Sequence, residues 1–170
     1  MIKIIAHRGN LEGPNLFHEN DPECLAEILA KTDFDIEIDV RVGYENTNQY
    51  FMLGHDYGQH KIEANELLGR TFCNPRVWMH AKSIETFLVL EPLFGPNVFF
   101  HTNEDMVLTT YNHIWLYPGK ERHIFKSKKD NCVLVLPELT YGTDISKWNV
   151  NDYYAVCTDY PNRLKEYLNV

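Results

Sequence analysis

The chain has 170 residues, a formal net charge of −8 at pH 7 and 13% aromatic residues. This length suits a single domain over residues 1–170 that can bury a substantial hydrophobic core. The acidic balance argues against nonspecific nucleic-acid binding, which needs a basic surface. An anionic small molecule is still compatible with it, because a few local cations and a metal ion can dominate the field of one site.

The cysteines and the apolar runs limit the possible classes of protein further. The four cysteines are widely spaced and form no Cys-x-x-Cys pattern, which argues against a zinc site built on thiolates. No apolar run reaches the length that spans a membrane. The N-terminal apolar run is short and leads directly into His7, unlike a signal peptide. We therefore expect a cytoplasmic protein without membrane insertion.

Strand and helix patterns alternate along the chain, beginning with a strand at residues 2–6. Asp21 followed by Pro22 is typical of a helix start, and apolar residues at helical spacing continue to near Thr32. The further predicted elements are a strand at 34–40, an extended run at 50–54, a short helix at 63–68, a strand at 77–82, a helix from Ser83 that ends by Pro92, strands at 97–102, 113–117 and 132–136, a helical turn at 144–148, a strand at 153–158 and a helix at 161–168. Such alternation is typical of parallel α/β folds.

The predicted strand at residues 34–40 carries a pair of acids on one face. Apolar residues alternate with acids there, so Glu37 and Asp39 point the same way, about 7 Å apart along the strand. Like charges this close are unfavourable without a cation between them, and carboxylates are preferred ligands of hard divalent cations. The alternative is an edge strand with one wet acidic face.

Two further motifs follow strand-like runs. His7-Arg8-Gly9 ends the first strand, and His55-Asp56 ends the extended run at residues 50–54. An arginine binds phosphate oxygens in a bidentate fork, and two histidines can carry a proton to and from a reacting group. Together with the acidic pair, these residues suit a metal-assisted reaction at a phosphodiester.

The order of these motifs resembles that of the glycerophosphodiester phosphodiesterases, within the wider phospholipase C-like phosphodiesterase superfamily. The first strand of that family ends in His-Arg-Gly, here residues 7–9. Its helix-starting Pro-Glu-Asn-Thr segment corresponds to His18-Glu19-Asn20-Asp21, and its Glu-x-Asp-Val strand to residues 37–40. A later His-Asp corresponds to residues 55–56, and the last strand with its Thr-Asp-x-Pro turn corresponds to residues 154–161.

The chain also departs from the family pattern. The third barrel strand of the family carries Glu-x-Lys, whose Glu is a metal ligand. Here Lys82 is kept, but His80 stands in place of the acid. His18 and Asp21 replace the Pro and Thr of the helix-starting segment, and residues 100–153 match no motif of the family. The resemblance therefore covers both ends of the chain and little of its middle.

The resemblance implies an α/β fold, a small or incomplete TIM (β/α) barrel of the phospholipase C-like phosphodiesterase type. The strand patterns along the chain give seven barrel strands, one fewer than a full barrel, and leave a seven- or an eight-stranded barrel open. The resemblance also implies a metal-dependent phosphodiester hydrolase that acts on a small glycerophosphodiester or a related phosphodiester. His7 and His55 would be the acid–base pair. Arg8 would stabilise charge on the phosphate, and Glu37 and Asp39 would hold Mg²⁺ or Ca²⁺.

Five further residues have two interpretations each. Glu19 is either a metal-site residue or a helix-start acid stabilised by the helix dipole. His80 is either a metal ligand, which would let Mn²⁺ or Zn²⁺ compete better, or a substrate contact. Lys82 either binds phosphate or fills the barrel beside an acid. His101 either binds substrate or is a pocket-wall or structural residue. Trp115 either binds substrate or is an aromatic core residue.

Two other functions stay open from the sequence. A degenerate barrel could bind a phosphate-containing ligand without turnover, which would follow if His80 cannot replace the missing acidic ligand. The enzyme could also act on a lipid or on a glycan-linked glycerol phosphate. An exposed apolar rim at the mouth of the site would favour the lipid substrate.

Overall fold

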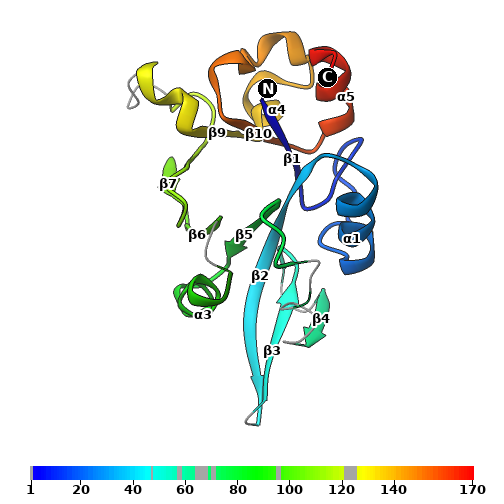
Figure 1. The fold of residues 1–170 in the computed structure, drawn as a ribbon, viewed down its shortest axis with the longest axis vertical. Coiled ribbons are helices and arrows are strands. Elements are labelled where there is room, and N and C mark those ends of the chain that lie inside the picture. The colour runs from blue at the N-terminus through cyan, green and yellow to red at the C-terminus, as the bar shows by residue number, and fades with distance from the viewer. Residues whose placement is uncertain are drawn as a thin grey trace.

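Ten strands form one mixed sheet that curls into a half-barrel in the computed structural model (Figure 1). The structure describes residues 2–46, 48–56, 59–63, 69, 72–94, 97–120 and 126–170. The strands are β1 (Lys3–His7), β2 (Asp35–Glu45), β3 (Asn48–Leu53), β4 (His60–Glu63), β5 (Val77–Ala81), β6 (Val98–Phe100), β7 (Met106–Leu108), β8 (Ile114–Leu116), β9 (Cys132–Val135) and β10 (Ala155–Thr158). The α-helices are α1 (Pro22–Lys31), α3 (Ile84–Phe94), α4 (Pro137–Tyr141) and α5 (Pro161–Leu168), and short 3₁₀ helices span Lys126–Asn131, Ile145–Lys147 and Val150–Asp152.

The long strand β2 organises the sheet. Its first half lies parallel to β1 on one side and to β5 on the other, with Asp39 opposite His80 in the β5 register. Its second half continues antiparallel to β3, and β3 pairs in turn with β4. Figure 1 shows this second half as a hairpin that extends away from the body of the molecule. The other parallel pairs are β1 with β10, β10 with β9, β9 with β8, and β5 with β6.

The predicted small or incomplete TIM (β/α) barrel is wrong. Strands and helices do not alternate, since β3 and β4 follow β2 directly and run antiparallel. Strand β7 is antiparallel to β8, and residues 109–113 close the turn between them. A parallel crossover needs a dozen or more residues, so the short connections here can only join antiparallel neighbours. The described residues between β6 and β9 contain no α-helix.

The individual elements agree with the sequence better than the topology does. The predicted strands at 2–6, 34–40, 77–82, 132–136 and 153–158 and the helices at 22–32 and 161–168 are confirmed to within a few residues, except that β2 runs on to Glu45. Strands β6 and β8 are shorter than predicted, and β7 was not predicted. Pro92 does not end the helix after Ser83, because α3 continues to Phe94. The short helix predicted at 63–68 falls largely on residues 64–68, which lie outside the described residues.

The two faces of the sheet are packed differently. One face packs against Leu25 of α1, Leu90 of α3 and Leu164 of α5 in the larger hydrophobic cluster. The buried members of the smaller cluster come from strands alone: Ile5, Trp78, Phe99, Trp115, Val133, Val135, Ala155 and Cys157. Side chains two residues apart lie on the same face of a strand. Where a member of this cluster lies near the carboxyl end of a parallel strand, the side chain two residues later lies on the same face. That side chain is therefore the next one toward the carboxyl edge of the sheet.

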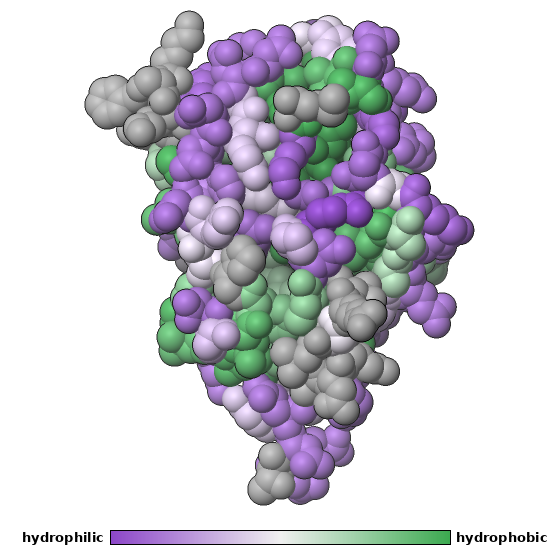
Figure 2. All heavy atoms as spheres, in the orientation of Figure 1, coloured by the Kyte–Doolittle hydropathy of each residue, from purple (hydrophilic) through white to green (hydrophobic). Residues whose placement is uncertain are grey.

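The helices and the surface add two observations. Within the residues described, none of the helices has the length and apolarity needed to cross a bilayer. On the face shown in Figure 2, hydrophobic patches lie above and below a largely hydrophilic band that crosses the middle of the molecule.

Arg76 ties the start of β5 to the connection between α1 and β2. Its guanidinium donates hydrogen bonds to the backbone carbonyls of Leu29 and Thr32, at 3.0 and 2.8 Å, and also to that of Phe34. We expect Arg76→Ala to lower the free energy of unfolding by about 2 kcal/mol or more, because hydrogen bonds to charged donors are individually strong. Urea denaturation would measure the loss.

The matched control is Arg76→Lys, which keeps the positive charge 3.8 Å from Asp35 but cannot reach three carbonyls at once. We expect this variant to be destabilised as well. If Arg76→Lys were as stable as the wild type, the positive charge of Arg76 and not its hydrogen bonds would account for its contribution to stability.

Candidate functional site

A cavity of about 230 Å³ lies at the carboxyl ends of the parallel strands. Every site residue predicted from the sequence lines it except Glu19. The lining residues are His7, Arg8, Glu37, Asp39, His55, His80, Lys82, His101, Thr102, Trp115, Tyr117, Val135 and Leu136. The fold thus brings together motifs that are separated by more than a hundred residues of sequence.

Glu37, Asp39 and His80 form a group that could hold a metal ion. One ligand atom from each lies within 4.8 Å of the other two, and all three residues are buried. Nε2 of His80 is buried and has no hydrogen-bond partner in the described part of the chain. Two carboxylates and an imidazole are a donor set that divalent cations accept. The residues present therefore fit a metal ion.

The surroundings of the Glu37 and Asp39 carboxylates differ. Burial by itself would raise the pKa of Asp39, but the hydrogen bond with His80 and the charges of Lys82 and Arg8 outweigh it and hold that pKa well below its usual range. Burial raises the pKa of Glu37, and the charge of Asp39 beside it adds to the rise. Asp39 is therefore the permanently charged member of the pair.

His7 is held by a carboxylate at the end of β10. Its Nδ1 lies 2.7 Å from Oδ1 of Asp159, and its Nε2 lies 3.9 Å from Oε2 of Glu37. Burial lowers the pKa of His7, but the Asp159 hydrogen bond and the charges of Glu37 and Asp159 outweigh it, so that pKa is raised. Burial raises the pKa of Asp159, but its contacts with His7 and Asn10 outweigh it, and the pKa is lowered. His7 and Asp159 therefore favour a charged pair.

Asp159 is itself fixed on its other side. Its oxygen accepts a hydrogen bond from Asn10 Nδ2 at 2.8 Å, and its backbone N–H donates to Oε1 of Glu138 at 2.7 Å. The same Glu138 oxygen accepts from the Thr158 hydroxyl at 3.0 Å. The orientation of the His7 ring therefore depends on residues from α4 and from the segment after β1.

Arg8 turns into the site through a left-handed backbone conformation, with φ at 52°. Its backbone N–H donates to Glu37 Oε2 at 3.3 Å, and its guanidinium donates to Glu19 Oε2 at 3.0 Å. Its Nε lies 2.9 Å from Asp39 Oδ2, without the direction of a hydrogen bond. The other Glu19 oxygen accepts from Asn10 at 3.0 Å. Glu19, for which the sequence left a metal-site role and a helix-start role open, binds Arg8 and is not part of the group formed by Glu37, Asp39 and His80.

His55 lies at the rim of the cavity. Its side chain is 49% exposed, and its Nδ1 lies 3.0 Å from an oxygen of Asp56. Its backbone carbonyl accepts a hydrogen bond from Arg41 at 2.8 Å. Of the two histidines predicted as an acid–base pair, His7 is thus held within the site and His55 faces solvent.

Aromatic rings form the opposite wall. His101 stacks on His80 with ring centroids 4.2 Å apart, and the Tyr117 hydroxyl lies 3.3 Å from His101 Nε2. Burial, together with the charge of His80, lowers the pKa of His101 to about 4, so this imidazole is neutral at pH 7. Trp115 is buried, and its ring centroid lies 4.4 Å from that of Phe99. Trp115 therefore supports the bottom of the cavity and offers little surface to a ligand.

Asn10, Asn20 and Asp159 are among the contributors to the site that were not predicted from the sequence as site residues. Asn20 is fully buried and binds Asp39 twice, accepting from its backbone N–H at 2.8 Å and donating to Oδ2 at 3.3 Å. Its own N–H donates to the Arg8 carbonyl at 2.9 Å. Asn20 and Asp159 lie in segments that carry the family resemblance, which was the available indication. Asn10 had none beyond its place after residues 7–9.

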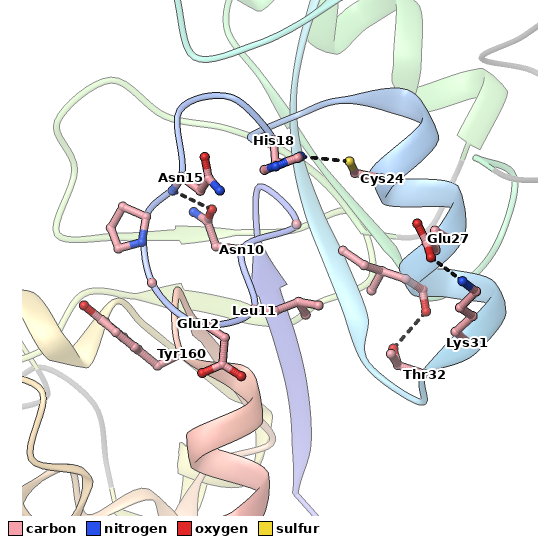
Figure 3. A pocket seen from close by; sticks show the side chains of 14 residues that line it. Asn10, Leu11, Glu12, Asn15, His18, Cys24, Glu27, Lys31, Thr32 and Tyr160 are labelled. Carbon is pink, nitrogen blue, oxygen red and sulfur yellow. Dashed lines mark hydrogen bonds and ion pairs between the residues drawn. The ribbon is translucent and has the colours of Figure 1, made fainter.

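A larger cavity, of about 740 Å³, lies between residues 9–15, α1 and Tyr160 (Figure 3). It contains the His18–Cys24 contact at 3.3 Å and the Glu27–Lys31 ion pair. It includes none of the metal-binding group and no arginine. Size alone would favour this cavity, but its chemistry does not, and we assign the candidate site to the smaller one.

Comparison with known proteins adds no assignment. No family model matches the chain, and no curated protein matches it significantly. The functional argument therefore rests on the residues of the site.

Asp159→Asn tests the pairing with His7. The Asp159 pKa is lowered in the folded protein, so its contribution to stability is present above its unfolded value, about 3.9, and is lost as the pH falls through the folded value. The His7 pKa is raised, so its contribution is present below its unfolded value, about 6.5, and is lost as the pH rises through the folded value. The loss of stability in Asp159→Asn should therefore be largest between about pH 4 and 6.5.

Urea denaturation of both proteins across pH, in the presence of a chelator, measures this difference. In the same samples, NMR titration of the His7 ring should give a lower pKa in the variant, while His113, far from Asp159 in the fold, serves as the internal control. A stability difference that does not change with pH would rule out the charged pair.

Proposed function

We propose that this protein is a metal-dependent phosphodiester hydrolase of the glycerophosphodiester phosphodiesterase type. One observation carries the proposal: a single cavity combines a possible divalent-cation site, two cations that could bind phosphate, and a histidine oriented by a carboxylate. Each part has a role in phosphodiester cleavage, and none is needed for the stability of an ordinary core.

The metal ion would be held by Glu37, Asp39 and His80. It would supply charge neutralisation and polarisation at a phosphoryl oxygen. We propose Mg²⁺ or Ca²⁺ from the two carboxylates. The imidazole of His80 makes the site softer than an all-oxygen site, so Mn²⁺ or Zn²⁺ are expected to compete well.

His7 and His55 would transfer the protons. Asp159 occupies Nδ1 of His7, which leaves Nε2 facing the cavity beside Glu37. The raised pKa of His7 favours its protonated form, which suits the role of a general acid to the leaving alkoxide. His55 at the rim would be the partner that activates the nucleophile, either water or a hydroxyl next to the phosphodiester.

Arg8 and Lys82 would bind the phosphate. Arg8 is directed by Glu19 and by its own backbone, so its guanidinium is held in place before a ligand arrives. Charge develops on the equatorial oxygens during phosphoryl transfer, and fixed cations there usually give the largest stabilisation. His101 and Tyr117 would form the wall against which the alcohol portion lies.

The size of the cavity supports a small reacting group. At about 230 Å³ it is below the volume typical of sites for drug-sized ligands. One observation favours a lipid as the larger part of the substrate: Leu16 and Phe17, in the segment between β1 and α1, are 77% and 90% exposed. Neighbouring exposed apolar side chains are typical of contact with an apolar partner.

The activity test is a panel of substrates with each divalent metal. Glycerophosphocholine, a lysolipid and bis-(p-nitrophenyl) phosphate would be assayed with Mg²⁺, Ca²⁺, Mn²⁺ and Zn²⁺. We expect metal-dependent turnover, and we expect His7→Ala to reduce kcat/KM by ~10²–10⁴-fold because a general acid contributes about this much. His60→Ala is the matched control, since His60 does not line the cavity and its side chain lies 3.8 Å from Asp21.

Full turnover by His7→Ala would remove this histidine from the mechanism. Binding of a phosphodiester by the wild type with no turnover on any substrate would favour the alternative function, a protein that binds a phosphate-containing ligand without cleaving it.

Metal binding is tested separately by calorimetry. We expect Glu37→Gln to weaken Mn²⁺ binding by at least about tenfold, because even outer-shell changes around a metal cost about 10–100-fold in affinity. Glu37 is a better target than Asp39, whose neutralisation would leave the partly buried cations Lys82 and Arg8 without their shared partner. Glu45→Gln, at an exposed acid paired with Lys61, should bind as the wild type does. Equal affinities of Glu37→Gln and the wild type would exclude Glu37 as a ligand.

A further inference from the structure

The contacts of Asp39 raise the question of how a metal ion would reach it. Its Oδ1 lies 3.1 Å from Lys82 Nζ and 3.1 Å from His80 Nδ1. Its Oδ2 lies 2.9 Å from Arg8 Nε and accepts from Asn20 Nδ2 at 3.3 Å. Both oxygens of this carboxylate are therefore already occupied by groups of the protein.

Two cations of the protein already contact one of the two acids of the metal-binding group. Glu37 and Asp39 are the two acids of the group, and Lys82 and Arg8 are the two cations in contact with Asp39. A divalent ion bound to Asp39 would stand next to both cations. Like charges at such short range repel strongly in a buried site, so the ion and the two cations compete for the same carboxylate.

The two cations have different freedom to move. The Arg8 guanidinium stays anchored through NH1 on Glu19, while its Nε contact with Asp39 lacks hydrogen-bond direction. Lys82 lines the cavity on a flexible four-carbon chain. An anion in the cavity would offer both of them a partner other than Asp39.

We infer that Lys82 and Arg8 hold Asp39 in competition with the metal ion, so that the metal and a phosphodiester anion bind cooperatively. The inference rests on the proposed function, because it concerns the same cavity. An anion that draws Lys82 away frees one oxygen of Asp39 for the metal, and its negative charge offsets the charge that the metal adds. Linkage then requires the metal to raise the affinity for the anion by the same factor.

The test measures Mn²⁺ binding rather than activity. Mn²⁺ would be titrated into the wild-type protein by calorimetry at constant ionic strength, with and without saturating dimethyl phosphate, a monoanionic phosphodiester. We expect the anion to tighten Mn²⁺ binding by at least about fivefold, the lower end of typical coupling between two sites. Unchanged affinity would overturn the inference while leaving the metal site intact.

Lys82→Met gives the second arm. A bridging anion alone would tighten Mn²⁺ binding in any variant, whereas competition by Lys82 predicts that the variant binds Mn²⁺ more tightly than the wild type without any anion. The effect of dimethyl phosphate should also shrink in the variant. Lys61→Met is the matched control, because Lys61 contacts exposed Glu45 outside the cavity and its loss should leave Mn²⁺ affinity unchanged.

The outcomes separate the two proposals. Weaker Mn²⁺ binding by a folded Lys82→Met protein, checked by circular dichroism, would overturn the competition. If Lys82→Met does not fold, Lys82→Gln takes its place with the same expected result, and an unchanged Mn²⁺ affinity of the wild type with dimethyl phosphate still overturns the inference. Failure of the wild type to bind Mn²⁺, Mg²⁺ or Ca²⁺ would overturn the proposed function itself.

Discussion

Two buried carboxylates at the centre of β2 set the main physical constraint on this molecule. Glu37 and Asp39 are 2% and 1% exposed, and a buried charge is costly unless it is paired and hydrogen-bonded. The nearby strands and loops supply the compensation: a lysine and a histidine from β5 and the residues after it, an arginine and a histidine from the end of β1, and an asparagine just before α1. The same groups that balance the charge are those that a phosphate and a metal ion would contact.

The positions of the site residues could be predicted well because they depend on local rules. A strand that alternates in hydropathy fixes which side chains share a face, and motifs that end parallel strands meet at one edge of the sheet. The alternation placed Glu37 and Asp39 on one face, whereas His7 and His80 were added to them through the order of the motifs and the family resemblance. It could not show that His7 is paired with Asp159, because that contact depends on β10 lying beside β1 in the register that sets Ala6 opposite Thr158.

The topology was predicted poorly for equally physical reasons. A hydropathy period of two is the same for parallel and antiparallel strands, so the antiparallel pairing of β3 could not be derived from the sequence, and β4 and β7 were not predicted as strands at all. Strands β6, β7 and β8 have three residues each, too few for a reliable period. The site is less sensitive to this error than the fold. It needs β1, β2, β5 and β10 as parallel neighbours, and it does not need the sheet to close.

The hairpin of β2 and β3 links two parts of the candidate chemistry in a way that restricts changes in chain length. Val40 lies opposite Leu53, and the Gly54 N–H donates to the Asp39 carbonyl at 3.0 Å. The strand register of the hairpin therefore fixes the position of His55 relative to Asp39. Extra residues at the far end of the hairpin, beyond the Glu45–Asn48 pair, leave that register unchanged. One extra residue within either strand shifts the register by one and turns side chains to the opposite face. The far end of this hairpin is therefore a suitable place to insert a tag or a reporter domain, whereas the segment nearer Asp39 must keep its length.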